Sequence, residues 1–255
     1  MFRLRVLLLI LAFPGFLASQ TQLASDSQAL ALAAESTASM TGGVSIRDVT
    51  LTGTVTRNSV ETGTVTLRAS GTDKSRVDLV FDGGPRTEIR DTWMGVPRGE
   101  WTGPNQTSGK LSFHNCQTDA VWFFPALSSL AMEKTVALLY KGHELRNGTS
   151  VEHIQSYVHD IGQSYRPTKE QLSTMDFYLD ATTLRPLAVR FNVHPDNDPT
   201  VNLVNEIFFS DYHTINGVTT PMHIQRYQQG NLMLDIVLSD ASLNTNLHPS
   251  IFAIQ

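Results

Sequence analysis

Cysteine is almost absent: the 255 residues include only Cys116. A disulfide within one chain is therefore excluded, so a buried hydrophobic core has to stabilise the fold. Clusters of lysine and arginine are also missing, and 24 acidic residues outnumber 19 basic ones, which gives a formal net charge of −5. A surface of this kind does not neutralise a row of phosphates, which argues against a nucleic acid partner.

Long hydrophobic runs are scarce, and the longest one lies at the start. Two arginines precede an apolar stretch over residues 6–17, and small residues follow it. This order is typical of a signal peptide, and the stretch is shorter than the roughly 20 residues of a spanning helix. We predict a signal peptide over residues 1–20 and one domain over 21–255, exported and soluble in the periplasm. Because Cys116 lies far from the predicted cleavage, no lipid anchor is expected.

Motifs for catalysis or nucleotide binding are lacking: the sequence has no Gly-x-Ser-x-Gly, His-Glu-x-x-His or phosphate loop. The nearest cluster is His114, Cys116 and Asp119, where a strand would place His114 and Cys116 on one face, within reach of a metal or of each other. The alternative is a buried structural thiol, because sequence neighbours rarely supply a base and an orienting group. Residues 194–199 alternate acids as calcium loops do, but they lack the required glycine and glutamate, so a turn is predicted. We expect no enzyme, no metal and no cofactor.

An N-terminal helix is predicted over residues 23–40, where apolar residues recur near helical spacing. Ser25 or Asp26 is available as its cap, and the glycine pair at 42–43 would end it. The segment 120–131 is the most hydrophobic part of the mature chain, and Pro125 favours a short helix from about residue 125 to 133.

From Val49 onward the hydrophobic period is two, which indicates strands with one apolar face. Asn147-Gly148, Asn216-Gly217 and other turn pairs separate these segments, so about ten or eleven antiparallel strands are predicted. Residues 92–115 are rich in glycine and proline and hold Trp93 and Trp101. We interpret them as a long, partly ordered crossing loop.

The segments 187–193 and 232–238 show the apolar face most clearly. In the first, this face consists of Leu187, Val189, Phe191 and Val193. A sheet of so many strands curls, and its concave apolar face has to be covered. The predicted fold class is mainly β (α+β), an incomplete antiparallel barrel with an N-terminal helix and short capping helices. The concave face either leaves an apolar hollow for a lipid or acyl chain or packs fully against the chain itself.

The order of elements, together with Asp-Val-Thr-Leu-Thr-Gly-Thr at 48–54 and the strand, turn and strand over 208–238, resembles the LolA/LolB-like superfamily. That superfamily comprises periplasmic lipoprotein carriers, mycobacterial lipid-binding lipoproteins and anti-sigma-factor regulators. The resemblance implies an incomplete barrel whose hollow takes acyl chains, with no cofactor and no chemistry. The chain departs from the carriers in being longer, chiefly over 93–115. The carriers' lid-latching arginine has four candidates here, which are Arg57, Arg68, Arg76 and Arg90.

The predicted function is a periplasmic carrier or binding protein for a lipid, an acyl chain or a lipoprotein anchor. The alternative is an envelope regulatory or interaction module that recognises a protein partner with the same fold. Transient membrane contact is a further expectation. The aromatic residues at 122–124, together with Trp93 and Trp101, form either a surface that touches a membrane or a partner, or part of the hydrophobic core. The predicted ligand-binding residues combine bulk with an inward face or a lid position: Trp122, Phe123, Phe124, Leu127, Leu130, Val189, Phe191, Leu234 and Ile236.

Overall fold

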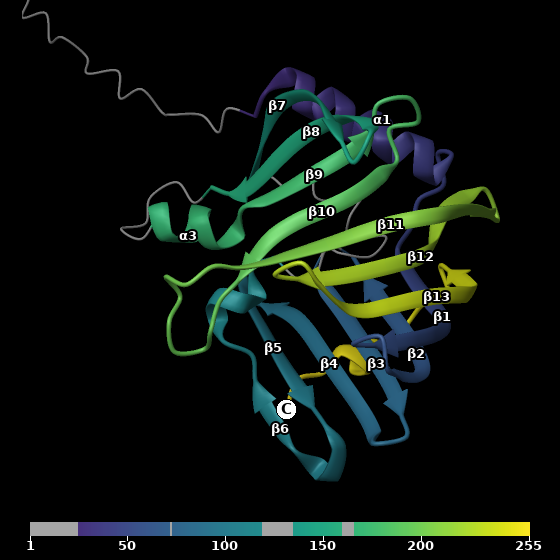
Figure 1. The fold of residues 1–255 in the computed structure, drawn as a ribbon, viewed down its shortest axis with the longest axis vertical. Helices are drawn as coiled ribbons and strands as arrows, with labels where there is room; N and C mark the ends of the chain where they lie inside the picture. The colour runs from purple at the N-terminus through teal and green to yellow at the C-terminus, as the bar shows by residue number, and fades with distance from the viewer. Residues whose placement is uncertain (1–24, 72, 119–134, 160–165) are drawn as a thin grey trace, which may run out of the picture.

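The computed structural model describes residues 25–71, 73–118, 135–159 and 166–255. A single antiparallel sheet of 13 strands dominates it (Figure 1). The strands are β1 (Asp48–Arg57), β2 (Glu61–Ser70), β3 (Lys74–Phe81), β4 (Gly84–Trp93), β5 (Val96–Thr102), β6 (Ser108–Lys110), β7 (Val136–Arg146), β8 (Thr149–Val158), β9 (Met175–Asp180), β10 (Pro186–Val193), β11 (Leu203–Ile215), β12 (Val218–Gln228) and β13 (Asn231–Leu243). The helices are α1 (Ser27–Thr41), α3 (Arg166–Ser173) and the 3₁₀ helices η1 (Pro104–Gln106), η2 (Phe113–Cys116) and η5 (Pro249–Phe252).

The sheet is curled but not closed. Its strand order is β6-β5-β4-β3-β2-β1-β13-β12-β11-β10-β9-β8-β7, so the edge strands β6 and β7 do not pair with each other. The first and last strands, β1 and β13, are neighbours in the middle of the sheet. This arrangement confirms the predicted mainly β fold class and the incomplete barrel.

Tight two-residue turns join many of the strands, as the sequence predicts for Asn147-Gly148 and Asn216-Gly217. Four of these turns share one backbone shape, in which both central residues have positive φ, as the right-handed twist of a hairpin favours. The φ angles are 50° and 77° at Met94-Gly95, 51° and 82° at Asn147-Gly148, 51° and 82° at Asn216-Gly217, and 49° and 78° at Gln229-Gly230.

The predicted crossing loop over 92–115 is wrong in its central part, because residues 96–102 and 108–110 form the strands β5 and β6. Glycine serves close packing here: a Cβ on Gly99 would lie 2.5 Å from Cδ1 of Leu111. Likewise, a Cβ on Gly109 would lie 2.9 Å from the indole Nε1 of Trp101. Gly99 and Gly109 thus lie within extended strands with side chains packed closely against them, and the described residues form more strands than predicted.

α1 begins and ends close to the predicted bounds. Gly42 ends it with φ of 56°, as the sequence predicts. Asp26 is the N-cap residue, but its carboxylate makes no cap hydrogen bond and accepts one from the backbone N–H of Tyr140 at 2.8 Å. The Ser25 hydroxyl accepts a hydrogen bond from the backbone N–H of Leu138 at 3.1 Å. The start of α1 is therefore fastened to the edge strand β7.

The other end of α1 contacts β12, and Ala29 is fully buried in the main hydrophobic cluster. Because β7 and β12 are far apart in the sheet, a helix that contacts both has to cross its inner face. The predicted helix near 125–133 lies outside the described residues. None of the helices formed by the described ranges is long and apolar enough to cross a membrane.

Candidate functional site

The inner face of the sheet is a continuous apolar surface. Ile236 on β13 lies opposite both Val55 on β1 and Ile224 on β12. Farther along the sheet, Val189 on β10 lies opposite Ile207 on β11. These five side chains are at most 1% exposed and belong to one cluster that reaches from β3 to β7. The alternation of apolar residues along the strands therefore gathers them on one face, as the sequence predicts.

Four of the nine predicted ligand-binding residues can be placed on this surface. Val189, Phe191 and Ile236 are buried members of the cluster, and Leu234 is a partly buried residue packed against it. They share one face, as predicted, while their contact with a ligand stays a prediction. The other five lie outside the described ranges: Trp122, Phe123, Phe124, Leu127 and Leu130.

One residue of the predicted apolar face points the other way. The pairing of β9 with β10 shifts its register between Pro186 and Ala188. As a result, Leu187 packs with Ala188 and Tyr178 in a separate cluster, whereas Val189 belongs to the main one. A register shift of one residue moves a side chain to the opposite face, and no local pattern marks this shift.

Val189 and Ile236 have no exposed surface, so a ligand can touch them only if covering atoms move. The parts of the cluster that a ligand could reach first are its partly buried members. Only Leu234 of these partly buried residues is among the predicted ligand-binding residues. The full set comprises Leu32, Ala33, Val77, Val136, Tyr140, Val193, Tyr212, Ile215, Leu234 and Leu243.

Residues 111–118, here named the crossing segment, connect two distant parts of the sheet. The side-chain amide of Asn115 donates to the His194 carbonyl at 2.7 Å, and its oxygen accepts from the His194 N–H at 2.8 Å. The Ser112 hydroxyl also donates to Asp196 at 2.5 Å. From the other side, Arg90 on β4 donates to the Asn115 carbonyl at 2.5 Å. The segment thereby ties β4 to the loop between β10 and β11, which belong to parts of the sheet that are far apart in its strand order.

Arg90 differs from the other three candidates for a latching arginine. Its side chain is 5% exposed and is also paired with Glu88 on the same strand at 2.8 Å. Arg57 pairs with a glutamate on the next strand, and Arg68 and Arg76 both pair with Asp78. Of the four, Arg90 is the arginine whose guanidinium binds the crossing segment.

The predicted alignment of His114 and Cys116 on a strand is wrong, because both lie on η2. The His114 ring nitrogen Nε2 lies 3.1 Å from the Pro195 carbonyl, and the buried Cys116 thiol donates to the Ser112 carbonyl at 3.4 Å. Asp119 lies outside the described residues. Within the described ranges, no three His, Cys, Asp or Glu residues are placed to hold a metal ion.

Residues 194–199 form the predicted turn. The backbone N–H of Asp198 donates to the Pro195 carbonyl at 3.0 Å. The carboxylate of Asp198 accepts hydrogen bonds from the N–H and the hydroxyl of Thr200, at 2.9 Å and 2.6 Å. Asp198 is thus engaged by its own loop, whereas Asp196 accepts from Ser112 of the crossing segment.

The sequence analysis missed chains of serine, histidine and acid that form only across strands. On the β7–β8 hairpin, His143 Nε2 lies 2.7 Å from the Ser150 hydroxyl and Nδ1 lies 2.9 Å from Glu152. His143 is 53% exposed, and Glu152 also accepts from Tyr140 at 2.7 Å. Water reaches the exposed His143 imidazole, whereas nucleophilic catalysis needs a site that excludes water. A second chain consists of Ser210, His223 and Asp235.

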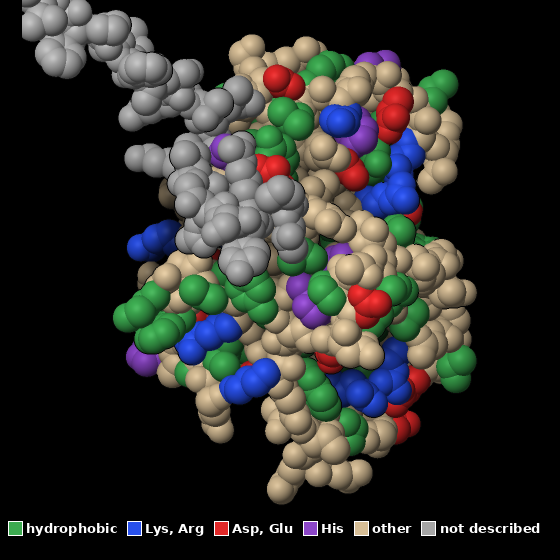
Figure 2. All heavy atoms as spheres, turned by 90° about the vertical axis from the view of Figure 1, so that its left-hand side faces the viewer, with side chains coloured by type: hydrophobic (Ala, Val, Ile, Leu, Met, Phe, Trp, Pro, Cys, Tyr) green, Lys and Arg blue, Asp and Glu red, His purple; other side chains and the backbone are tan. Residues whose placement is uncertain are grey.

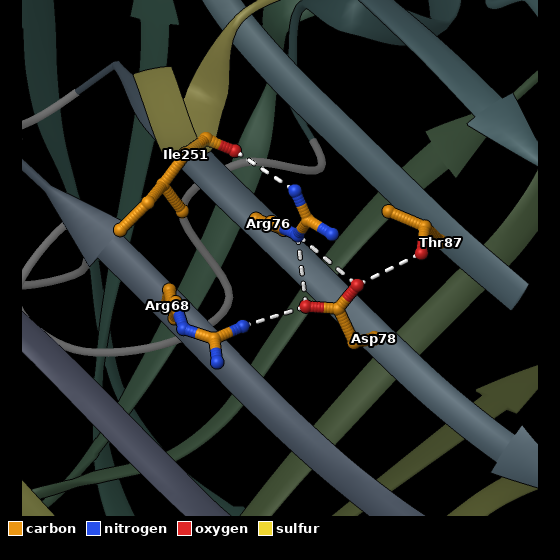
Figure 3. Close-up of polar contacts among 5 residues, drawn as sticks. All are labelled: Arg68, Arg76, Asp78, Thr87 and Ile251. Atoms are coloured by element: carbon orange, nitrogen blue, oxygen red, sulfur yellow. Dashed lines mark hydrogen bonds and ion pairs between the residues drawn. The ribbon is translucent and has the colours of Figure 1, made fainter. Parts of the chain in front are cut away.

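A polar cluster occupies the outer face of β2, β3 and β4, beneath the C-terminal segment (Figure 3). Asp78 accepts hydrogen bonds from Arg68 at 2.6 Å, from Arg76 at 2.8 Å and from Thr87 at 2.8 Å. Arg76 also donates to the Ile251 carbonyl at 3.1 Å. A pocket of about 590 Å³ adjoins this cluster and continues along β5 and β6. The cluster fastens residues 249–255 to the sheet, and its charges are already paired.

Asp78 is expected to make stability depend on pH. Burial would raise its pKa, but hydrogen bonds from Arg76 and Thr87 and the charges of both arginines outweigh burial, so the pKa lies below its usual value. A lowered folded-state pKa stabilises the protein above about pH 4, and this contribution is lost as the pH falls through that pKa. Asp78→Asn should therefore flatten the fall in unfolding free energy below pH 4. Urea unfolding at several acidic pH values measures the slope, and equal slopes would contradict this role.

Comparison with known proteins gives a fold but no sequence relative. No protein-family model and no curated protein matches the chain. Solved structures do match. A domain assigned to outer membrane lipoprotein sorting, from Vibrio parahaemolyticus, is 16% identical with a TM-score of 0.56, covering 88% of this chain and 96% of its own.

Two further structures match over similar lengths. A LolA superfamily protein from Nitrosomonas europaea is 12% identical with a TM-score of 0.55, covering 89% of this chain and 97% of its own. A DUF1329 family protein from Desulfovibrio piger is 13% identical with a TM-score of 0.54, covering 88% and 97%. The curled, unclosed sheet with a helix across its inner face is therefore a LolA-like fold. The resemblance stated from the sequence is confirmed at the level of the fold.

Proposed function

We propose that this chain is a periplasmic carrier or binding protein that holds an apolar ligand against the inner face of its sheet and catalyses no reaction. The ligand would be a lipid, an acyl chain or a lipoprotein anchor. The observation that carries the proposal is the continuous apolar inner face, which α1 crosses from β7 to β12. A fold shared with a lipoprotein-sorting domain supports it.

The route to the periplasm is part of the proposal. Residues 1–20 would direct export and be removed, and residues 21–255 would act as one ligand-binding domain. The order of positive charge, apolar stretch and small residues supports this.

A ligand would enter by loosening the crossing segment. Arg90 and Asn115 would hold the segment in place, and the partly buried inner residues Leu234 and Tyr140 would meet the ligand first. Val189, Phe191 and Ile236 would line the deeper part once covering atoms move aside. Hydrocarbon would replace the contacts that these side chains lose, so burial of apolar surface drives the exchange.

Leu234→Gln is expected to weaken the binding of a fluorescent fatty acid about tenfold, because a polar amide would replace an apolar group that meets the ligand. Val237→Gln is the matched control. It lies on the same strand but on the opposite face and is 52% exposed. Titration in solution without vesicles measures both affinities. Equal affinities for the two variants would remove Leu234 from the site.

Native mass spectrometry and lipid extraction of the purified protein test the function itself. Co-purifying lipid, lost after delipidation and regained on adding fatty acid, is expected. A protein that binds no hydrocarbon under these conditions would contradict the carrier function and favour the envelope module that recognises a protein partner.

A further inference from the structure

The turn between β4 and β5 exposes three apolar side chains to water. Trp93 is 56% exposed, Met94 is 82% exposed and Val96 is 50% exposed. Phe113, on the η2 helix that packs beside β5, is 53% exposed. Figure 2 shows hydrophobic side chains in small groups among polar and charged ones on one side of the molecule. Large apolar side chains that adjoin each other on an exposed turn mark a contact surface.

The backbone of this turn does not call for a methionine. The three other turns of the same shape have asparagine, asparagine and glutamine at the first position, where Met94 stands with φ of 50°. Positive φ is unfavourable for a residue with a long side chain, and asparagine tolerates it better. Met94 recovers little of this cost by packing, since most of its surface is exposed. Folding therefore does not explain an apolar side chain at this position.

The size and shape of the patch favour a membrane over a protein partner. A stable protein interface buries about 1,000 Å² or more, which one two-residue turn does not supply. A turn that exposes tryptophan, methionine and valine fits the boundary between lipid headgroups and acyl chains, where indole rings are enriched. Arg98 lies at the base of the turn, with its guanidinium 5.8 Å from the Trp93 ring centre and paired with Asp91 at 2.9 Å. Its charge would stay at headgroup level while the tip enters.

We propose that the β4–β5 turn inserts Trp93, Met94 and Val96 into the interfacial layer of a lipid bilayer and docks the protein there transiently. The inserted surface is apolar, and the chain has a formal net charge of −5. Insertion rather than attraction to anionic lipid therefore drives the contact. This inference goes beyond the proposed function, because the turn and the inner face are separate surfaces.

Co-sedimentation with phosphatidylcholine vesicles tests the proposal. Met94→Asn introduces the residue that the matching turns use, so thermal unfolding should stay unchanged or shift upward. The partition coefficient of this variant is expected to fall about tenfold, because most of a buried methionine's transfer free energy is lost. Binding of the wild-type protein should be similar at low and high salt. The control is Asn147→Met, which adds a methionine to the equivalent β7–β8 turn, where no tryptophan adjoins it. In the double variant, Asn147→Met should not restore the vesicle binding that Met94→Asn removes.

Two results would overturn the proposal: wild-type protein that does not sediment with vesicles, or a Met94→Asn variant that sediments as well as the wild type. Fatty acid titration without vesicles separates this test from that of the carrier function. Met94→Asn should bind fatty acid as the wild type does. If the wild-type protein did not bind fatty acid, the carrier function would be contradicted. The sedimentation result would still test vesicle docking on its own.

Discussion

Arg90→Ala is expected to lower the free energy of unfolding by about 3 kcal/mol and to accelerate ligand release. The guanidinium is buried and bonds the Asn115 carbonyl and Glu88, so its removal leaves polar groups without their partner in a poorly hydrated place. It also releases the crossing segment from β4. Urea unfolding measures the first effect, and stopped-flow displacement of a fluorescent fatty acid measures the second.

Two further variants define what Arg90 does. Arg57→Ala removes a half-buried arginine from a pair within one hairpin, and a loss of about 1 kcal/mol or less is expected. Asn115→Ala removes the link to His194 while keeping the carbonyl that Arg90 binds. Because both side chains hold one segment, Arg90→Ala combined with Asn115→Ala should accelerate release by less than the two separate effects together. If Arg90→Ala released the fatty acid at the wild-type rate, the crossing segment would not control ligand release.

Gly53→Val is expected to destabilise the protein by about 4 kcal/mol or to prevent folding. Gly53 lies at the register shift between β1 and β13, and a Cβ there would lie 2.2 Å from the Val237 carbonyl oxygen and 2.7 Å from the Leu238 Cα. Both contacts are with backbone, so no side chain can move away to make room. Thr54→Val on the same strand is exposed and should change stability little. Thermal unfolding by circular dichroism compares them, and equal midpoints would contradict the steric argument.

Local patterns predicted those parts of the fold that local interactions determine. Gly42 ends α1 because left-handed backbone suits glycine, and Asn147-Gly148 forms a hairpin turn because both residues accept positive φ. The alternation along β10 and β13 placed Val189, Phe191 and Ile236 on one face correctly. In these cases, the physical cause lies within a few residues of the observed feature.

The failures share a different cause. Gly99 indicated a loop, but it lies in β5, where the side chain of Leu111, beyond the β5–β6 connection, packs against it. Arg90 could not be distinguished from three other arginines, because its partner Asn115 is bound in turn to His194, 79 positions away. Contacts of this kind depend on the completed sheet. Local sequence therefore lacks the contacts that distinguish Gly99 and Arg90 from similar residues elsewhere in the chain.

The pairing of β1 with β13 has a consequence for folding. Every other neighbouring pair in the sheet is sequential along the chain, so two meanders, β1 to β6 and β7 to β13, can each form from nearby segments. Joining them requires residues about 190 positions apart to meet, as Val49 and Leu243 do. Closing so long a loop is entropically costly before its contacts form. The central seam should therefore be the last part of the sheet to assemble, and each half would have an unpaired strand edge until it does.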